Sequence, residues 1–213
     1  MRVLPDPAAS SIRVGGFEGL SLCDWPGQIA ATIFCQGCPW DCPYCHNPHL
    51  IPSISDTELE WDGILRFLET RRGLLDGVVF SGGEPTLQKG LEDAIGQVRS
   101  LGFRIGLHSA GPYPERLASV LPLVDWIGFD VKAAFADYQR VTRTPKSGER
   151  ARKSLEHVLG SGIDFQIRTT IDPKLLDDEA IARLKADLAG FGVQQHKLQE
   201  MRLHGVRPDA YKS

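Results

Sequence analysis

The chain has 213 residues, with 24 Lys and Arg against 27 Asp and Glu and a formal net charge of −3. This length suits one domain with a substantial core, and the charge gives no reason to expect a nucleic-acid or anionic-membrane partner. No apolar run approaches the ~18 residues of a spanning helix, and the N-terminus lacks the apolar stretch of a signal peptide. Four of the 5 cysteines fall close together, at positions 35–45. This clustering indicates a metal site rather than disulfides, and hence a reducing compartment, most simply the cytoplasm.

From residue 29 onward, strand-like apolar runs alternate with amphipathic helical ones. Most of the runs are short and continuous in apolarity, as buried parallel strands are. A Thr57/Glu60 pair resembles a capping box in front of the first helix. The expected strands are 29–35, 76–81, 103–108, 124–130, 164–170 and about 193–200. The expected helices carry the apolar faces Trp61/Ile64/Leu65/Leu68, Leu87/Leu91/Ile95/Val98, Leu155/Val158/Leu159 and Ile181/Leu184/Leu188.

This alternation predicts an α/β fold with a parallel sheet built from right-handed βαβ units. The units are too few for a closed eight-stranded barrel of about 250 residues, so we expect a partial, open barrel. Residues 1–28 are expected to form an N-terminal arm or short hairpin, and residues 29–213 the barrel, within a single domain. In sheets of this type, functional groups collect at the C-terminal ends of the strands.

Three cysteines follow the first of these strands, in the run Cys38-Pro-Trp-Asp-Cys42-Pro-Tyr44-Cys45. Three thiolates can hold three irons of a [4Fe–4S] cube and leave the fourth iron open to a substrate, whereas electron-transfer clusters normally use four cysteines. Cys35 lies three positions earlier, so a four-cysteine zinc site or a fully ligated cluster is the alternative. Structural zinc usually spaces its cysteine pairs further apart, and the bacterial ferredoxin spacing does not fit.

Two further motifs stand at the ends of the second and third strands. The second strand ends in Gly82-Gly83-Glu84, where paired glycines allow the backbone to approach a ligand closely and the carboxylate is suited to an ammonium group. The third strand ends in His108-Ser109. A histidine satisfied by nearby backbone is as good an interpretation of His108 as a functional one.

Charged residues mark the fourth and fifth strands. Asp130 and Lys132 are two positions apart, so their side chains should project together from the end of the fourth strand. A surface salt bridge is the alternative interpretation of this pair. Arg168 lies in an otherwise apolar strand, where burial is costly unless a carboxylate lies nearby.

Taken together, these motifs resemble the radical S-adenosylmethionine (SAM) superfamily, whose signature is C-x3-C-x-aromatic-C. The resemblance implies a (β/α)6 partial barrel and a [4Fe–4S] cluster held by Cys38, Cys42 and Cys45. In that family the open iron chelates SAM, and an electron from the cluster cleaves SAM to methionine and a 5′-deoxyadenosyl radical. No catalytic residue beyond the cluster and SAM is implied. The cofactor-binding residues implied are Tyr44, Gly82, Gly83, Glu84, Ser109, Asp130, Lys132 and Arg168.

Within the superfamily, residues 16–27 and the run Cys45-His46-Asn47-Pro48 are most similar to activating proteins of anaerobic ribonucleoside-triphosphate reductase. This resemblance implies hydrogen abstraction from a glycine of a partner glycyl-radical enzyme, with an electron from a flavodoxin- or ferredoxin-type donor. The alternatives are a radical SAM enzyme acting on another peptide or a small molecule, and a non-catalytic Fe–S or zinc module.

The sequence leaves the roles of several residues open. His108 and Arg202 have no assigned role, and Arg202 stands near the position where some activases carry a histidine. We expect Cys23 and Cys35 to be small buried hydrophobic residues rather than ligands.

Overall fold

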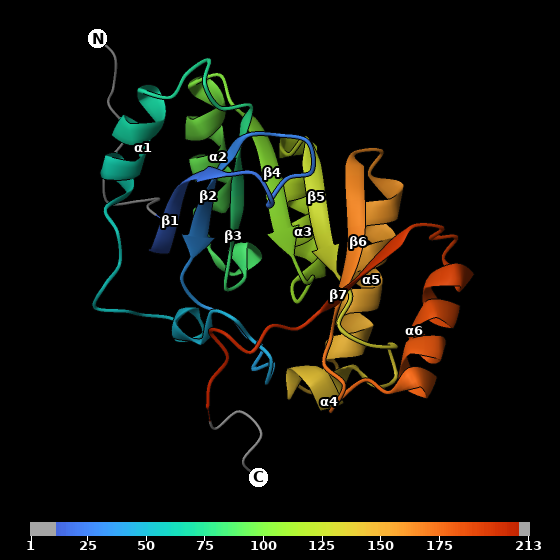
Figure 1. The fold of residues 1–213 in the computed structure, drawn as a ribbon. Coiled ribbons are helices and arrows are strands. Elements are labelled where there is room, and N and C mark those ends of the chain that lie inside the picture. Colours follow the sequence, from blue (N-terminus) through green and yellow to red (C-terminus); the bar gives the residue numbers. More distant parts are fainter. Residues whose placement is uncertain (1–11, 209–213) are drawn as a thin grey trace.

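The computed structural model describes residues 12–208. Its centre is a seven-stranded sheet in the order β1-β2-β3-β4-β5-β6-β7. The first pair of strands is antiparallel and all later pairs are parallel. The sheet is curved and does not close (Figure 1). The strands are β1 (Val14–Ser21), β2 (Ala30–Cys35), β3 (Gly77–Gly82), β4 (Arg104–Ser109), β5 (Trp126–Asp130), β6 (Asp164–Ile171) and β7 (His196–Glu200).

Helices follow the strands and cover one face of the sheet (Figure 1). No helix in the described part of the chain is long and apolar enough to cross a membrane. The α-helices are α1 (Trp61–Glu69), α2 (Leu91–Ser100), α3 (Pro114–Val120), α4 (Tyr138–Thr142), α5 (Ser147–Gly160) and α6 (Asp178–Gly190). Short 3-10 turns lie at η1 (Pro48–Leu50), η2 (Pro85–Leu87) and η3 (Leu121–Leu123).

The predicted open α/β barrel is confirmed, and each of the expected parallel strands is present. The arm contributes a strand of its own, β1, which pairs with β2. Residues 1–11 of the predicted arm lie outside the described residues, and the division at residue 28 stays a prediction.

The predicted capping box before α1 is wrong. Glu60 is the N-cap and makes no side-chain hydrogen bond to the helix. Thr57 lies in a separate turn, in which its backbone N–H donates to the Ser55 hydroxyl. Leu87 was expected in the second helix but belongs to η2, because Pro85 begins a short 3-10 turn after β3.

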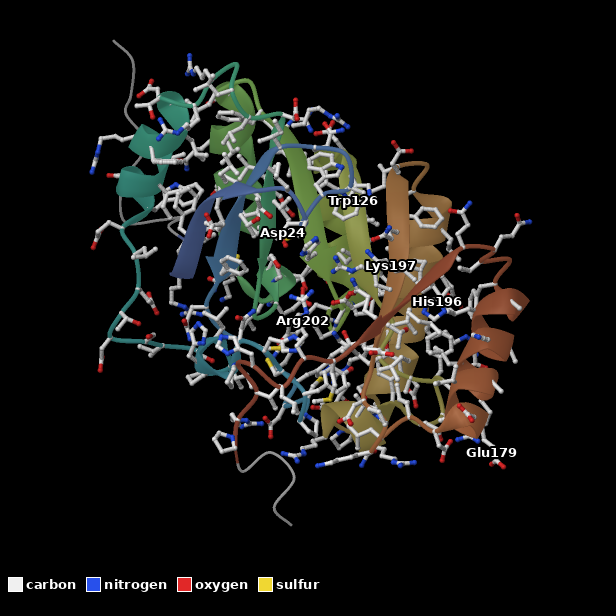
Figure 2. The ribbon with its side chains drawn as sticks, viewed as in Figure 1. Asp24, Trp126, Glu179, His196, Lys197 and Arg202 are labelled. Atoms are coloured by element: carbon white, nitrogen blue, oxygen red, sulfur yellow. The ribbon has the colours of Figure 1, made fainter. Side chains whose placement is uncertain are left out.

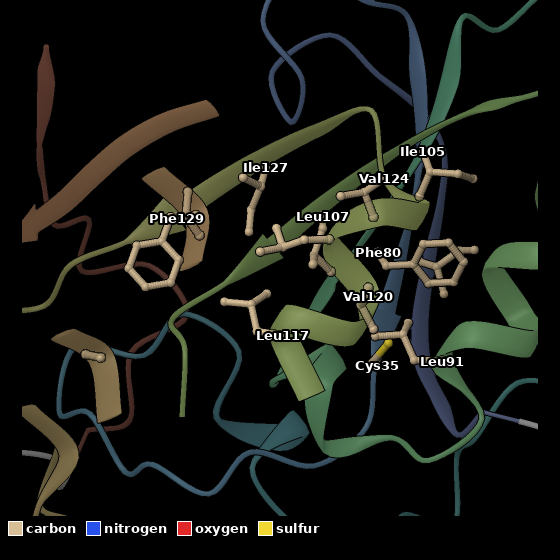
Figure 3. Packing of buried hydrophobic residues seen from close by; sticks show 14 of the residues in the cluster. Cys35, Phe80, Leu91, Ile105, Leu107, Leu117, Val120, Val124, Ile127 and Phe129 are labelled. Carbon is tan, nitrogen blue, oxygen red and sulfur yellow. The ribbon is translucent and has the colours of Figure 1, made fainter. Parts of the chain in front are cut away.

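The two faces of the sheet are packed differently. The face toward the helices holds the main apolar core, in which Phe80, Leu107 and Phe129 are fully buried (Figure 3). The inner face of the barrel holds a small second cluster of Trp25, Ala30, Val79 and Trp126.

Glycines on the inner face make room for these two tryptophans, whose rings stack with centroids 5.6 Å apart. A Cβ added at Gly77 or Gly106 would lie 2.8 or 2.9 Å from the Trp25 ring. The arm therefore fills the inside of the barrel with Trp25 and leaves the C-terminal ends of the strands for other groups.

Candidate functional site

The three cysteines lie in the loop formed by residues 36–52, which we call the cysteine loop. It follows β2 and folds back on its own start, since Gly37 N donates to Leu50 O (2.8 Å) and Cys38 N to Ile51 O (3.1 Å). A turn joins the last two cysteines, with Cys45 N donating to Cys42 O at 3.1 Å. The loop thus presents the three thiols from one compact segment at the C-terminal end of β2.

The environment of Cys38 and Cys42 disfavours a free thiolate. Burial raises the pKa of Cys38 to about 12 and that of Cys42 to about 11. In residues 12–208, no three His, Cys, Asp or Glu side chains converge closely enough to hold one metal ion. A cube distributes its ligands over three irons, so three thiolates need not meet at one point to hold it.

The two remaining cysteines lie in different surroundings. Cys35 is fully buried in the helix-facing core, beside Leu91 and Val120 (Figure 3), so its expected burial is confirmed. Cys23 is exposed, with its sulfur 3.5 Å from the Ser21 hydroxyl, so its expected burial is wrong. Cys23 lies in the bend that follows β1, which ends at Ser21.

The glycine pair after β3 packs directly against the cysteine loop. Gly82 has φ +107°, and a Cβ there would lie 2.4 Å from Cys35 N. A Cβ at Gly83 would lie 2.3 Å from Gly37 O. Only glycine fits this contact, which leaves backbone groups close to the cysteines.

The carboxylate of Glu84 ties η2 to the end of β4. It accepts hydrogen bonds from Thr86 N (3.0 Å) and the Thr86 hydroxyl (2.6 Å), and from the Ser109 hydroxyl (2.9 Å) and Ala110 N (3.1 Å). Burial raises the pKa of Glu84, although these hydrogen bonds act in the opposite direction. Glu84 and Ser109 were predicted separately, and the structure joins them in one buried contact.

Asp130, Lys132 and Arg168 form a charged cluster at the ends of β5 and β6. Asp130 lies 3.3 Å from Lys132 Nζ and 2.8 Å from Arg168 Nε. The three side chains are 29%, 15% and 13% exposed, so this is not an isolated surface salt bridge. Burial opposes the charges of Asp130 and Lys132, but the charges of Arg168 and Lys132 still hold the pKa of Asp130 well below its usual range. Asp130 in turn holds the pKa of Lys132 above its usual value.

His108 connects this cluster to the N-terminal arm. Its Nε2 lies 2.7 Å from Asp24 O and 3.2 Å from Arg168 Nη1, and its Nδ1 lies 3.0 Å from the Ser81 hydroxyl. Burial and the charge of Arg168 lower the pKa of His108 to about 4. His108 is therefore neutral and satisfied by the distant backbone of Asp24, which is labelled in Figure 2. No local pattern in the sequence reveals this long-range contact.

A C-terminal segment, residues 201–208, returns from β7 to the cysteine loop (Figures 1 and 2). The backbone N and O of Arg202 lie 3.2 and 2.9 Å from His46 Nε2, and Arg207 forms an ion pair with Asp41. The contact of Arg202 with the loop is thus made by its backbone. Sequence reasoning missed His46 and Asp41 as the residues that hold this segment.

A cleft of about 730 Å³ lies elsewhere, between β6, β7 and the end of α5. It is lined by residues such as Phe165, Gln166 and His196, which stand at the N-terminal ends of their strands. None of the sequence-predicted site residues lines it, so the candidate site is the opposite end of the barrel.

The residues at the C-terminal end fit an iron–sulfur cluster with a charged organic ligand. The cysteine loop supplies three thiols, the glycine pair supplies a close backbone approach, and the charged cluster supplies groups of both signs. In addition, the Trp40 Nε1 and Tyr44 Oη atoms of the loop are buried with no hydrogen-bond partner among the described residues. Buried polar atoms without a protein partner fit a site in which a bound group supplies the hydrogen bonds.

Comparisons with known proteins identify a family and two relatives of this chain. A family model described as the Radical SAM superfamily matches residues 32–185. A Methanocaldococcus jannaschii protein named as a glycyl-radical enzyme activating enzyme is 30% identical over 209 residues, covering 85% of this chain and 79% of its own. The pyruvate formate-lyase-activating enzyme of Clostridium pasteurianum is 31% identical over 207 residues, covering 94% and 85%.

Solved structures share the fold at low identity. Streptococcus suis SuiB bound to S-adenosylmethionine aligns with a TM-score of 0.61 at 12% identity, over 78% of this chain. The protein anSMEcpe with bound AdoMet aligns with a TM-score of 0.63 at 14% identity, also over 78% of this chain. The chain spans 39% and 49% of these two proteins.

Proposed function

The chain belongs to the radical SAM superfamily, and we propose that it is the activating enzyme of a glycyl-radical enzyme. Its cofactors are a [4Fe–4S] cluster and SAM. When bound and reduced, these cofactors supply a 5′-deoxyadenosyl radical, which takes a hydrogen atom from a glycine Cα of the partner. The protein itself supplies ligands, orientation and exclusion of water.

We assign the cluster to Cys38, Cys42 and Cys45, in the loop that also holds the buried Tyr44. The geometry supports this assignment because the three thiols belong to one compact loop, whereas Cys35 is the last residue of β2 and is fully buried beside Leu91 and Val120 (Figure 3). Three protein ligands leave one iron for SAM.

We assign SAM to the space between the glycine pair and the charged cluster. Backbone groups of Gly82 and Gly83 would contact its amino group. Lys132 and Asp130 would then contact its carboxylate and its ribose or methionyl end. The remaining residues hold these groups in place: Glu84 and Ser109 fix the glycine turn, and Arg168 balances the charge of Asp130.

The observation that carries the activase proposal is the similarity to the Clostridium pasteurianum enzyme over 94% of this chain. The open side of the barrel supports it, because β1 and β7 are the two unpaired ends of the sheet and leave a path for a peptide loop. Among possible partners we propose anaerobic ribonucleoside-triphosphate reductase, on the motifs of residues 16–27 and 45–48.

Reconstituted protein, SAM and a reductant should therefore produce a glycyl radical in the reductase, seen by electron paramagnetic resonance. The matched control is Cys45→Ala, which should give no radical. If wild-type protein cleaves SAM but leaves the reductase without a radical, the partner assignment is wrong. Radical formation in pyruvate formate-lyase instead would keep the activase function and change the partner.

A further inference from the structure

The corner between α4 and α5 is strongly basic, although the chain as a whole carries a net charge of −3. Residues 138–153 contain six Lys and Arg against a single acidic residue, Glu149. Three of the cations form ion pairs with carboxylates: Arg143 with Asp41, Arg152 with Glu156 and Lys153 with Glu115. All six are exposed, and we call the first four the basic corner: Arg140, Arg143, Lys146 and Arg150.

Two residues of the basic corner have a strained backbone. Arg143 (φ +55°) and Lys146 (φ +59°) are the non-glycine residues of the described chain with positive φ. This conformation costs roughly 1–2 kcal/mol for a residue with a side chain, and glycine adopts it freely. The chain thus carries a cation at two positions where glycine would be more stable. Strain of this kind is concentrated at functional sites.

The basic corner packs directly on the cysteine loop. Asp41 N donates to Thr142 O at 3.1 Å, and the Thr144 hydroxyl donates to Pro39 O at 3.3 Å. Arg143 forms an ion pair with Asp41 at 3.1 Å. The surface of the corner is therefore joined to the segment between Cys38 and Cys42.

An aromatic contact joins α4 to the cysteine loop. Trp40, which stands between Cys38 and Cys42 in the sequence, meets the ring of Tyr138 edge to face at 5.7 Å. Tyr138 is the first residue of α4 and is fully buried. A protein docked on the corner would thus lie against the helix that packs on the cysteine loop.

We propose that the basic corner is the docking surface for an acidic electron-carrier protein, which delivers one electron to the cluster. In this step the carrier loses one electron and the cluster gains one, and no bond forms or breaks. Complementary charge steers such encounters and raises their rate. The proposal rests on the proposed cluster ligation by the cysteine loop, and it does not depend on which glycine is the target.

The test compares two routes of reduction in the reconstituted holoenzyme. Two charge variants, R140E/K146E and the milder R140Q/K146G, are measured against wild type. Lys146→Gly also removes a strained residue, so this variant should fold. The matched control is R72E/K185E, which changes charge by the same amount as the first variant, at exposed positions after α1 and in α6. The carriers are a photoreduced acidic flavodoxin and a [2Fe–2S] ferredoxin, and dithionite is the small reductant that needs no docking.

We expect R140E/K146E to lower the second-order rate of cluster reduction by at least one carrier about tenfold or more at low salt. R140Q/K146G should lower this rate less. At high salt the rates of both variants should approach that of wild type. Dithionite reduction, SAM affinity and the dithionite-driven glycyl radical yield should match wild type, as should every rate of the control. A loss with only one carrier identifies that carrier as the partner type.

Three results would overturn the proposal. The first is that, at low salt, both carriers reduce the cluster of R140Q/K146G as fast as that of wild type. The second is a rate of cluster reduction by dithionite that falls in R140Q/K146G as much as the rate with the carriers does. The third is normal reduction by the carriers with impaired radical formation in the partner, which would make the corner a contact for the glycyl-radical enzyme. Failure of the activase function itself would appear separately, as normal cluster reduction in wild type with no glycyl radical.

Discussion

The two faces of the central sheet serve different purposes, although they belong to the same strands. Toward the helices, Leu107 and Phe129 are fully buried in the main core. Toward the inside of the barrel, their neighbours His108 and Asp130 join a polar and charged network. Because side chains alternate between the two faces of a strand, successive residues of one strand contribute in turn to the stability of the core and to the candidate ligand site. Substitutions on the two faces should therefore change different properties.

The largest difference is expected between substitutions of two cysteines that are close in sequence, Cys42 and Cys35. Cys42→Ala should abolish cluster assembly and SAM cleavage, because it removes one of three proposed ligands. Cys35→Ala should retain about four irons per chain and lose roughly 1 kcal/mol of stability, as a small core truncation does. Iron and sulfide content after anaerobic reconstitution checks both. Loss of the cluster in Cys35→Ala, with a normal cluster in Cys42→Ala, would show that Cys35 is a ligand and Cys42 is not.

A truncation on the helix-facing side should act on stability alone. Leu107→Ala removes a fully buried side chain, so the free energy of unfolding should fall by about 2–5 kcal/mol. The SAM affinity of the folded fraction should remain that of wild type. Denaturant titration and calorimetry at a temperature where the variant is folded measure the two quantities. A clear loss of SAM affinity would show that the core and the ligand site are not separate.

A substitution toward the inside of the barrel should act on ligand binding. Lys132→Gln should weaken SAM binding about tenfold or more, because hydrogen bonds to charged groups contribute roughly 1.5–3 kcal/mol. Stability and iron content should change little, and the exposed control Lys185→Gln should behave as wild type. Wild-type SAM affinity in Lys132→Gln would mean that Lys132 only neutralises Asp130.

The strand ends could be predicted from sequence because apolar runs and turn residues are local features. The run before Cys38 and the run before Gly82 each identify a strand, and parallel pairing then brings their ends together. The contacts between residues of the site could not be predicted from such local features. The contact of His108 with Asp24 joins β4 to the arm across 84 positions, and no periodicity reports such a contact. The exposure of Cys23 was missed because cysteine is usually buried, whereas this one lies in the bend that follows β1.

A further expected effect is a pH dependence of stability from His108. Its pKa is about 4 in the folded chain, against 6.5 ordinarily. Between these values the unfolded chain binds a proton that the folded chain does not, so stability falls as pH decreases from 6.5 to 4. The slope from this one group is at most about 1.4 kcal/mol per pH unit. The groups that face it are Arg168, Asp130, Ser81 and the carbonyl of Asp24.

His108→Gln should flatten this part of the stability profile relative to wild type. The exposed His204→Gln should leave the profile unchanged. Denaturant titrations at several pH values across the window give the difference directly. Parallel profiles for wild type and His108→Gln would show that the imidazole is not held neutral inside the barrel.

The activase function is tested most directly by following one hydrogen atom. The partner reductase is prepared with deuterium on its glycine Cα atoms and incubated anaerobically with the holoenzyme, SAM and reductant. Mass spectrometry should find deuterium in 5′-deoxyadenosine, in proportion to the glycyl radical formed. If SAM is cleaved in the presence of the partner and 5′-deoxyadenosine carries no deuterium, the hydrogen comes from another substrate. The chain would then be a radical SAM enzyme of a different function.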